Sequence, residues 1–178
     1  MKYFEELKKT MTWLGEKDNT IFIGQAVAYP GTAMFGTLEE VSMSKRIELP
    51  VLEEMQMGMT LGLSFEKIVP ISIFPRWNFL LCGVNQLVNH IDKLSLMGCD
   101  DFNSKIIIRT GIGSERPLHP QYQHVGDYTD AIQSMCNTVE VIRLEEPGDV
   151  FPAYKKAYER NDKRATICVE YGDYYSEK

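Results

Sequence analysis

The sequence predicts an α/β domain with three αβα layers, in which a mostly parallel β-sheet lies between two layers of helices. Strand candidates and helix candidates alternate along the chain of 178 residues. The strand candidates, such as VPISIF at 69–74 and KIIIRT at 105–110, are continuous apolar runs that do not alternate with polar residues. Strands of this kind are buried on both faces, which is typical of parallel sheets covered by helices on each side.

The elements follow one another in a regular order. The helix candidates have apolar residues at helical spacing and begin with an N-terminal amphipathic helix carrying Phe4, Leu7, Met11 and Leu14. The later helix candidates span 53–65, 77–97, 128–137 and 148–160. The strand candidates are 20–24, 46–49, 69–74, 105–110, 139–144 and 165–171, and the predicted loops are 25–45 and 111–127. Ligands bind at the carboxyl ends of parallel strands, so the loops after residues 24, 49, 74 and 110 are the expected place for chemistry.

Length and composition favour one globular domain over residues 1–178, with 44% hydrophobic residues to form its core. The formal net charge of -6 gives no support to a nucleic-acid partner or an anionic membrane surface. No apolar run reaches the roughly 18 residues that a membrane span requires, and the N-terminus lacks the apolar core of a signal peptide. The four cysteines lie far apart, at 82, 99, 136 and 168. We therefore expect reduced thiols in a cytoplasmic protein without a metal site.

A glycine-containing segment at the end of the fourth strand candidate, RTGIGSERP at 109–117, invites comparison with a dinucleotide-binding loop. The third glycine of that fingerprint is replaced by Arg116, and Pro117 and Pro120 disfavour a helix start. The segment also lies far from a first strand, where the fingerprint belongs. A dinucleotide-binding function is therefore disfavoured.

The most informative segment is RIELPVLEEMQMGMTLGLSF, at 46–65. Pro50 is followed by Glu53 and then by Gly58 and Gly62, which share one face of the predicted helix. Two glycines inside a helix cost roughly 1 kcal/mol each relative to alanine, so a packing reason for them is expected. On these residues alone, Glu53 and Glu54 have a simpler interpretation, since carboxylates favour the N-terminal end of a helix dipole.

The pattern Pro-x-x-Glu-x(4)-Gly-x(3)-Gly, followed by a strand and an aromatic-rich helix start, resembles the pyrimidine-binding domain of thiamine-diphosphate enzymes. It is most like the N-terminal half of 2-oxo acid dehydrogenase beta subunits, and transketolases resemble it more distantly. The resemblance runs from about residue 20 to residue 171. Its markers recur in order, at Gly24, Arg46, Pro50, Glu53, Gly58, Gly62, Phe79, Asn85-Gln86, Arg109, Gly111 and Gln123-His124.

The resemblance implies roles for several residues. It implies that Glu53 hydrogen-bonds the pyrimidine ring of thiamine diphosphate and so activates the cofactor, which carries the chemistry. It implies that Phe79 stacks on the aminopyrimidine, with Val51 and Trp77 as neighbouring cofactor contacts. His124, in the loop 111–127, matches a histidine that binds the substrate carboxylate or transfers a proton. The alternatives are a core aromatic for Phe79 and a plain surface histidine for His124.

The chain departs from the family pattern in ways that imply a partner. The diphosphate-binding signature, Gly-Asp-Gly followed by Asn-Asn, is absent from the sequence. The resemblance therefore implies an alpha-type subunit that binds the diphosphate and Mg²⁺, in a hetero-oligomer with two copies of each chain. Gln25 and Ala26 stand where the beta subunits often carry acidic residues, which weakens the case for acyl transfer to a lipoyl partner.

The expected function is therefore that of one subunit of a split enzyme acting on C–C bonds next to a carbonyl, with 2-oxo acid decarboxylation first. Ketol transfer of the transketolase type is the second possibility. A non-catalytic paralogue that stabilises a complete enzyme, and a generic binding domain with an incidental glutamate, are the rivals from other classes.

Overall fold

The computed structural model describes residues 2–97, 105–116 and 119–178. Their centre is a six-stranded sheet in the order β2-β1-β3-β4-β6-β5, and every pair of neighbouring strands is parallel. The strands are β1 (Thr20–Gly24), β2 (Arg46–Glu48), β3 (Val69–Ile73), β4 (Ile107–Ile112), β5 (Glu140–Arg143) and β6 (Thr166–Tyr171). The central strands β3, β4 and β6 are almost wholly buried, whereas the edge strands β2 and β5 are partly buried. This confirms the predicted parallel sheet.

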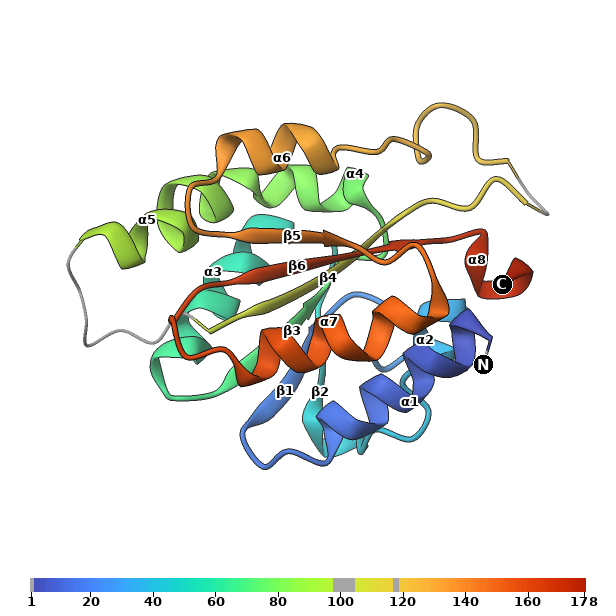
Figure 1. Cartoon of the computed structure of the whole chain (residues 1–178), viewed down its shortest axis with the longest axis horizontal. Helices are drawn as coiled ribbons and strands as arrows, with labels where there is room; N and C mark the ends of the chain where they lie inside the picture. The colour runs from blue at the N-terminus through green and yellow to red at the C-terminus, as the bar shows by residue number, and fades with distance from the viewer. Residues whose placement is uncertain (1, 98–104, 117–118) are drawn as a thin grey trace.

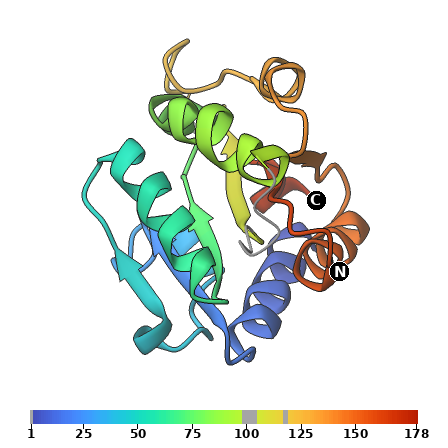
Figure 2. The same cartoon turned by 90° about the vertical axis from the view of Figure 1, so that its left-hand side faces the viewer.

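Helices cover both faces of the sheet and complete the three layers (Figures 1 and 2). One face is covered by α1 (Tyr3–Gly15) and α7 (Pro147–Glu159), which pack on each other and on the sheet. The other is covered by α3 (Glu53–Phe65), the helical segment 77–97 and α6 (Thr129–Met135). Successive residues of β4 enter opposite cores, since Ile107 belongs to the first core and Ile108 to the second. The strands are continuously apolar because both faces of the sheet are buried against helices, as the sequence predicted.

The predicted helix over 77–97 is wrong in detail, because the segment changes its winding several times. It consists of α4 (Trp77–Leu80), the 3-10 turn η2 (Leu81–Gly83), the π-helix η3 (Gln86–Ile91), α5 (Asp92–Leu94) and the 3-10 turn η4 (Ser95–Met97). Apolar spacing does not distinguish these windings over a few residues. The predicted loops also contain the short α2 (Ala33–Gly36) and η1 (Met43–Lys45), and α8 (Tyr174–Glu177) follows β6. In α1, Tyr3 takes the fully buried position while Phe4 is partly exposed.

Asp92 joins the end of the segment 77–97 to the turn before β5 by hydrogen bonds. Its carboxylate accepts hydrogen bonds from the backbone N–H groups of Asn137, Thr138 and Val139, at 2.8, 2.7 and 3.2 Å. Burial alone would raise the pKa of Asp92, but these hydrogen bonds and those from the Asn137 and Lys93 side chains hold that pKa well below its usual range. The buried carboxylate is therefore charged and structural.

Within the described residues, no helix is long and apolar enough to cross a membrane. The described cysteines, Cys82, Cys136 and Cys168, are free thiols, and Cys99 lies outside the described residues.

Candidate functional site

Glu53 is the first residue of α3 and lies at the carboxyl end of the sheet, after β2. Its side chain is only 7% exposed. The side-chain amide of Gln25, which follows β1, donates a hydrogen bond to Glu53 Oε1 at 3.3 Å. Glu53 lines an open depression of about 220 Å³ that is otherwise lined by Val51, Leu52, Glu54, Met55 and Cys82. A nearly buried carboxylate at the edge of a largely apolar depression is suited to contact a polar atom of a ligand.

Glu54 differs sharply from its neighbour. It is exposed, and its Oε1 accepts hydrogen bonds from Asn85 Nδ2 at 2.8 Å and Gln86 Nε2 at 3.3 Å. These two hydrogen bonds lower the pKa of Glu54. The predicted markers Asn85 and Gln86 therefore hold Glu54 on the surface, where it also lines the depression, whereas Glu53 is the nearly buried carboxylate of the pair.

Gly24 and Gln56 determine where α3 begins relative to the sheet. Gly24 has φ +143°, and a Cβ there would lie 2.2 Å from the carbonyl oxygen of Ile73, so only glycine fits. Gln56 Nε2 donates to the same Ile73 oxygen at 2.9 Å and to Ser72 Oγ at 3.1 Å. These buried bonds tie the first turn of α3 to the end of β3 and so hold Glu53 beside the loop after β1.

The loop after β1 is held by two charged residues of β2, of which the sequence singled out only Arg46. The Glu48 carboxylate accepts hydrogen bonds from three successive backbone N–H groups, at Ala26, Val27 and Ala28, over 2.9, 2.8 and 2.7 Å. Arg46 Nε donates to a loop carbonyl oxygen at 3.0 Å. The available signal for Glu48 was a second charged residue in the three-residue strand Arg46–Glu48.

Phe79 and His124 are brought together across the same end of the sheet. Their rings are stacked, with centroids 5.8 Å apart and an interplanar angle of 18°. The His124 Nδ1 atom is buried and has no hydrogen-bond partner among the described residues. One face of the Phe79 ring is thus occupied by imidazole, and the buried nitrogen is a polar atom whose hydrogen bond is unmet within the described residues.

The other two predicted cofactor contacts occupy contrasting positions. Trp77 is fully buried, with 0% of its surface exposed, and belongs to the core beneath α3 and α6. Its indole N–H is also without a partner in the part of the chain that the structure describes. Val51 is 62% exposed beside Glu53. Phe79, which is partly exposed, is therefore better placed than Trp77 to meet a ligand ring.

Arg109, a marker of the resemblance, forms a buried ion pair deeper in the same end of the sheet. Its Nε and Nη2 atoms donate to the two carboxylate oxygens of Glu170 at 2.6 and 3.0 Å. The Tyr154 hydroxyl donates to Glu170 at 2.8 Å, and the Tyr175 hydroxyl also donates to it. Burial opposes the charge of Arg109, but the pairing with Glu170 raises the pKa of Arg109 above its ordinary value. The cluster is saturated with hydrogen bonds and is structural.

A further cavity of about 310 Å³ lies beside this ion pair, at the ends of β3, β4 and β6. Arg76 and Glu170 are its charged lining residues. Among the described side chains, no group of three or more His, Cys, Asp or Glu residues could hold a metal ion.

Comparisons with known proteins bear on the family resemblance and on the fold. No protein-family model matches the sequence. The chain is 22% identical over 152 residues to the 2-oxoisovalerate dehydrogenase subunit beta of Bacillus subtilis (strain 168), covering 83% of this chain and 42% of that protein. It is 26% identical over 159 residues to the mitochondrial pyruvate dehydrogenase E1 component subunit beta of Ascaris suum, covering 87% of this chain and 43% of that protein. The chain thus spans less than half the length of these curated relatives.

Solved structures of the transketolase class have the same fold. A split-gene transketolase, in the form of an inactive beta4 tetramer, superposes with a TM-score of 0.71 at 14% identity, over 94% of this chain and 50% of that one. Transketolase from Leishmania mexicana superposes with a TM-score of 0.70 at 15% identity, over 94% of this chain and 25% of that one. The predicted resemblance is confirmed: the chain has homologues among the beta subunits of 2-oxo acid dehydrogenases and has the fold of transketolases.

Proposed function

We propose that the chain is the pyrimidine-binding subunit of a split thiamine-diphosphate enzyme acting on C–C bonds next to a carbonyl. Decarboxylation of a 2-oxo acid is the first candidate reaction, because the curated relatives are 2-oxo acid dehydrogenase subunits. Ketol transfer is the second candidate, favoured by the likeness of fold to transketolases. A cytoplasmic location, expected from the widely spaced cysteines, is part of the proposal.

The observation that carries the proposal is the position of Glu53. A carboxylate that is 7% exposed, with one side-chain hydrogen bond from Gln25, has oxygen lone pairs left for a ligand. Glu53 would hold the protonated ring nitrogen of the aminopyrimidine, Phe79 would offer its ring for stacking, and Val51 would line the entrance. When bound, the cofactor supplies the nucleophilic carbon, whereas the protein orients it and excludes water.

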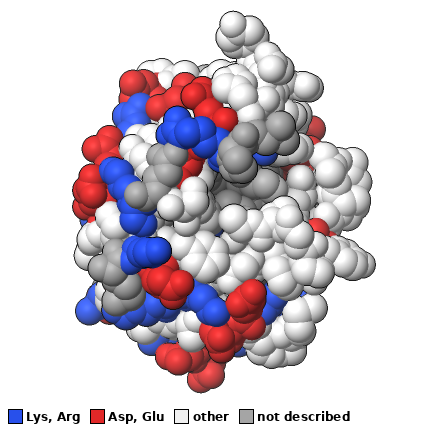
Figure 3. Space-filling model, turned by 90° about the vertical axis from the view of Figure 1, so that its right-hand side faces the viewer, with Lys and Arg blue, Asp and Glu red and all other residues white. Residues whose placement is uncertain are grey.

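An apolar surface on α3 supports the need for a partner. We define the α3 face as Val51, Leu52, Met55, Gly58, Met59 and Gly62. Its four large side chains are exposed, and nothing lies within 4 Å of a Cβ built on either glycine. Figure 3 views the molecule from the carboxyl end of the sheet, and charged side chains gather on its left, whereas the half on the side of α3 is mostly uncharged. Exposed apolar faces of this kind are typical of protein interfaces.

The proposed occupant of the α3 face is the alpha-type subunit, which would bring the diphosphate site and its Mg²⁺ next to Glu53. The face adjoins the depression in which Glu53 lies, since Val51, Leu52 and Met55 belong to both. Association would therefore cover the depression and form the cofactor site between the two chains. Two copies of each chain are the proposed assembly.

The test is turnover and cofactor binding of the co-expressed pair, with Glu53→Gln and the matched control Glu54→Gln. Glu53→Gln should abolish turnover, with at least a hundredfold loss of kcat, while calorimetry still detects thiamine diphosphate. Glu54→Gln changes the adjacent, exposed carboxylate and should retain most of the activity. Full turnover by Glu53→Gln would refute the catalytic role.

The same preparation separates the rival functions. A non-catalytic paralogue would bind the partner and leave turnover unchanged when Glu53 is altered. A generic binding domain would show no calorimetric signal with thiamine diphosphate, even in the presence of the partner and Mg²⁺. Either result would contradict the proposed function.

A further inference from the structure

The Arg76 cavity is a hollow of about 310 Å³ whose floor and walls come from the ends of three central strands. It is distinct from the depression at Glu53, because the two share no lining residue. Its polar lining side chains are Thr32, Arg76 and Ser114 from three different loops, Glu170 from β6 and Tyr175 from α8. We define the Arg76 cavity by Arg76, Thr32, Ser114, Gly111, Gly113 and Gly172.

Arg76 brings an unpaired positive charge to this cavity. The guanidinium is partly buried, and among the described residues it has no hydrogen bond or ion pair. The other charged group in the lining, Glu170, is already bound to Arg109 and to the hydroxyls of Tyr154 and Tyr175. Because the Glu170 charge is balanced by Arg109, the Arg76 cavity has a net positive charge.

Gly113 keeps the wall of the cavity open beside Arg76. A Cβ at Gly113 would lie 2.0 Å from the carbonyl oxygen of His124 and 3.3 Å from Arg76 Cδ. No side chain can therefore stand between the arginine and the loop that carries His124. The backbone of Gly113, which lines the cavity, therefore lies against the loop of His124, whose ring stacks on Phe79.

We propose that the Arg76 cavity binds a second acidic group of the substrate, a carboxylate or a phosphate. Arginine presents planar donors that match both groups, and Thr32 and Ser114 add hydroxyl donors. The substrate class is then a 2-oxo acid, or a ketose, with an acidic group at its far end. The acid-binding role itself depends only on residues of this chain. The identification of the ligand as the far end of a 2-oxo acid or ketose rests on the proposed function.

The first test is binding to the isolated full chain, followed by NMR at constant ionic strength. The probes are inorganic phosphate and glutarate, and the reporters are the backbone amides of Gly113 and Ser114. The wild-type chain should show saturable shifts, and Arg76→Gln should weaken binding by roughly ten- to a hundredfold, as expected for a charge-assisted contact. The tighter of the two probes identifies the preferred acid.

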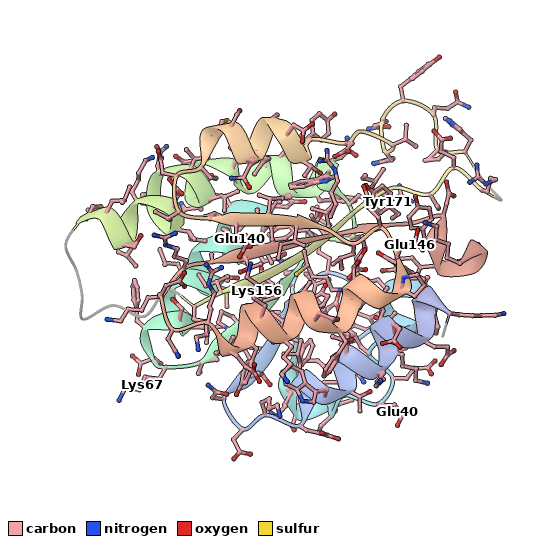
Figure 4. The ribbon with its side chains drawn as sticks, viewed as in Figure 1. Glu40, Lys67, Glu140, Glu146, Lys156 and Tyr171 are labelled. Carbon is pink, nitrogen blue, oxygen red and sulfur yellow. The ribbon has the colours of Figure 1, made fainter. Side chains whose placement is uncertain are left out.

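Lys67→Gln is the matched control, because it removes the same charge far from the cavity. Figure 4 shows Lys67 at the opposite end of the molecule from Tyr171, the residue after Glu170. Lys67→Gln should leave the dissociation constant unchanged. Linear, unsaturable shifts in the wild type, or equal binding by Arg76→Gln, would overturn the proposal.

The second test uses the pair with its partner and compares 2-oxoglutarate with 2-oxopentanoate, which differ in the terminal carboxylate. Arg76→Gln should lower kcat/KM for 2-oxoglutarate at least roughly tenfold more than for 2-oxopentanoate. Equal losses on both would refute the acid-binding cavity while the proposed function stands. Saturable phosphate binding without turnover of any 2-oxo acid or ketose would support the cavity and count against the proposed function.

Discussion

Substitution of the two glycines of the α3 face tests whether α3 is exposed in the isolated chain and covered by the partner in the complex. Gly58 and Gly62 lie inside α3, and nothing lies within 4 Å of a Cβ built on either. In the isolated chain, Gly→Ala should therefore gain the helix propensity of alanine without a steric cost. Each substitution should stabilise by about 1 kcal/mol, and both together by about 2 kcal/mol. For a chain of this length, that raises the Tm by about 4–8 °C.

The same double variant should act in the opposite direction on assembly. If the partner packs closely on the α3 face, two added methyl groups force its backbone or side chains apart, at a cost of about 1–3 kcal/mol. The Kd for the partner should then rise about five- to 150-fold. The measurements are urea unfolding of the isolated chain and titration of the wild-type and variant chains with the partner.

Gly148→Ala is the control for this experiment. Gly148 lies in the first turn of α7 on the opposite face of the sheet, and a Cβ there also meets nothing within 4 Å. It should not change the Kd for the partner. A loss of stability in isolated Gly58→Ala/Gly62→Ala, or an unchanged Kd, would refute the reasoning that α3 is bare in the chain and covered in the complex.

Three other substitutions or reactions test the fold. Gly24→Ala should lower the free energy of unfolding by about 3 kcal/mol or more, because its Cβ would lie 2.2 Å from a backbone oxygen; wild-type stability in urea would contradict this. Asp92→Asn should cost about 2–3 kcal/mol at pH 7. Because the folded-state pKa of Asp92 is lowered, its contribution is present above about pH 4 and is lost as the pH falls through the lowered value. The difference in stability from wild type should therefore shrink toward pH 2, and a constant difference would be the contrary result. Burial, and then the charge of Asp92, raises the pKa of Cys136 to about 11, so iodoacetamide at pH 8 should modify Cys136 far more slowly than the exposed Cys82 in peptide mass maps.

Much of the fold could be predicted because the hydrophobic pattern of a short stretch of sequence largely determines each strand or helix. The strands 20–24 and 69–73 are continuous apolar runs, and the helix from Glu53 to Phe65 matches its predicted bounds. The winding within 77–97 could not be predicted, since apolar spacing is nearly the same for α-, 3-10 and π-turns. The local sequence pattern thus predicts the position of a helix along the chain better than its type of helical winding.

Residues of the candidate site were predicted where they belong to one sequence motif. They were missed where their role depends on contacts between distant parts of the chain. Glu53 followed from its spacing to Pro50. Glu48 binds a loop about 20 residues earlier in the chain, and no local pattern indicates that pairing. Arg76 lies next to the predicted Trp77, but its significance depends on Glu170 being engaged by Arg109, which is visible only once the strands are side by side.

The order of the strands bears on how the chain folds during synthesis. β6, the last strand of the chain, lies between β4 and the edge strand β5 and pairs with both along its length. Until β6 leaves the ribosome, β5 has no neighbour in the sheet, and Arg109 lacks the carboxylate of Glu170 that balances its charge. At roughly 5–20 residues per second, the nascent chain spends several seconds with an incomplete sheet. The half of the domain from β4 onward is therefore where a chaperone is expected to bind.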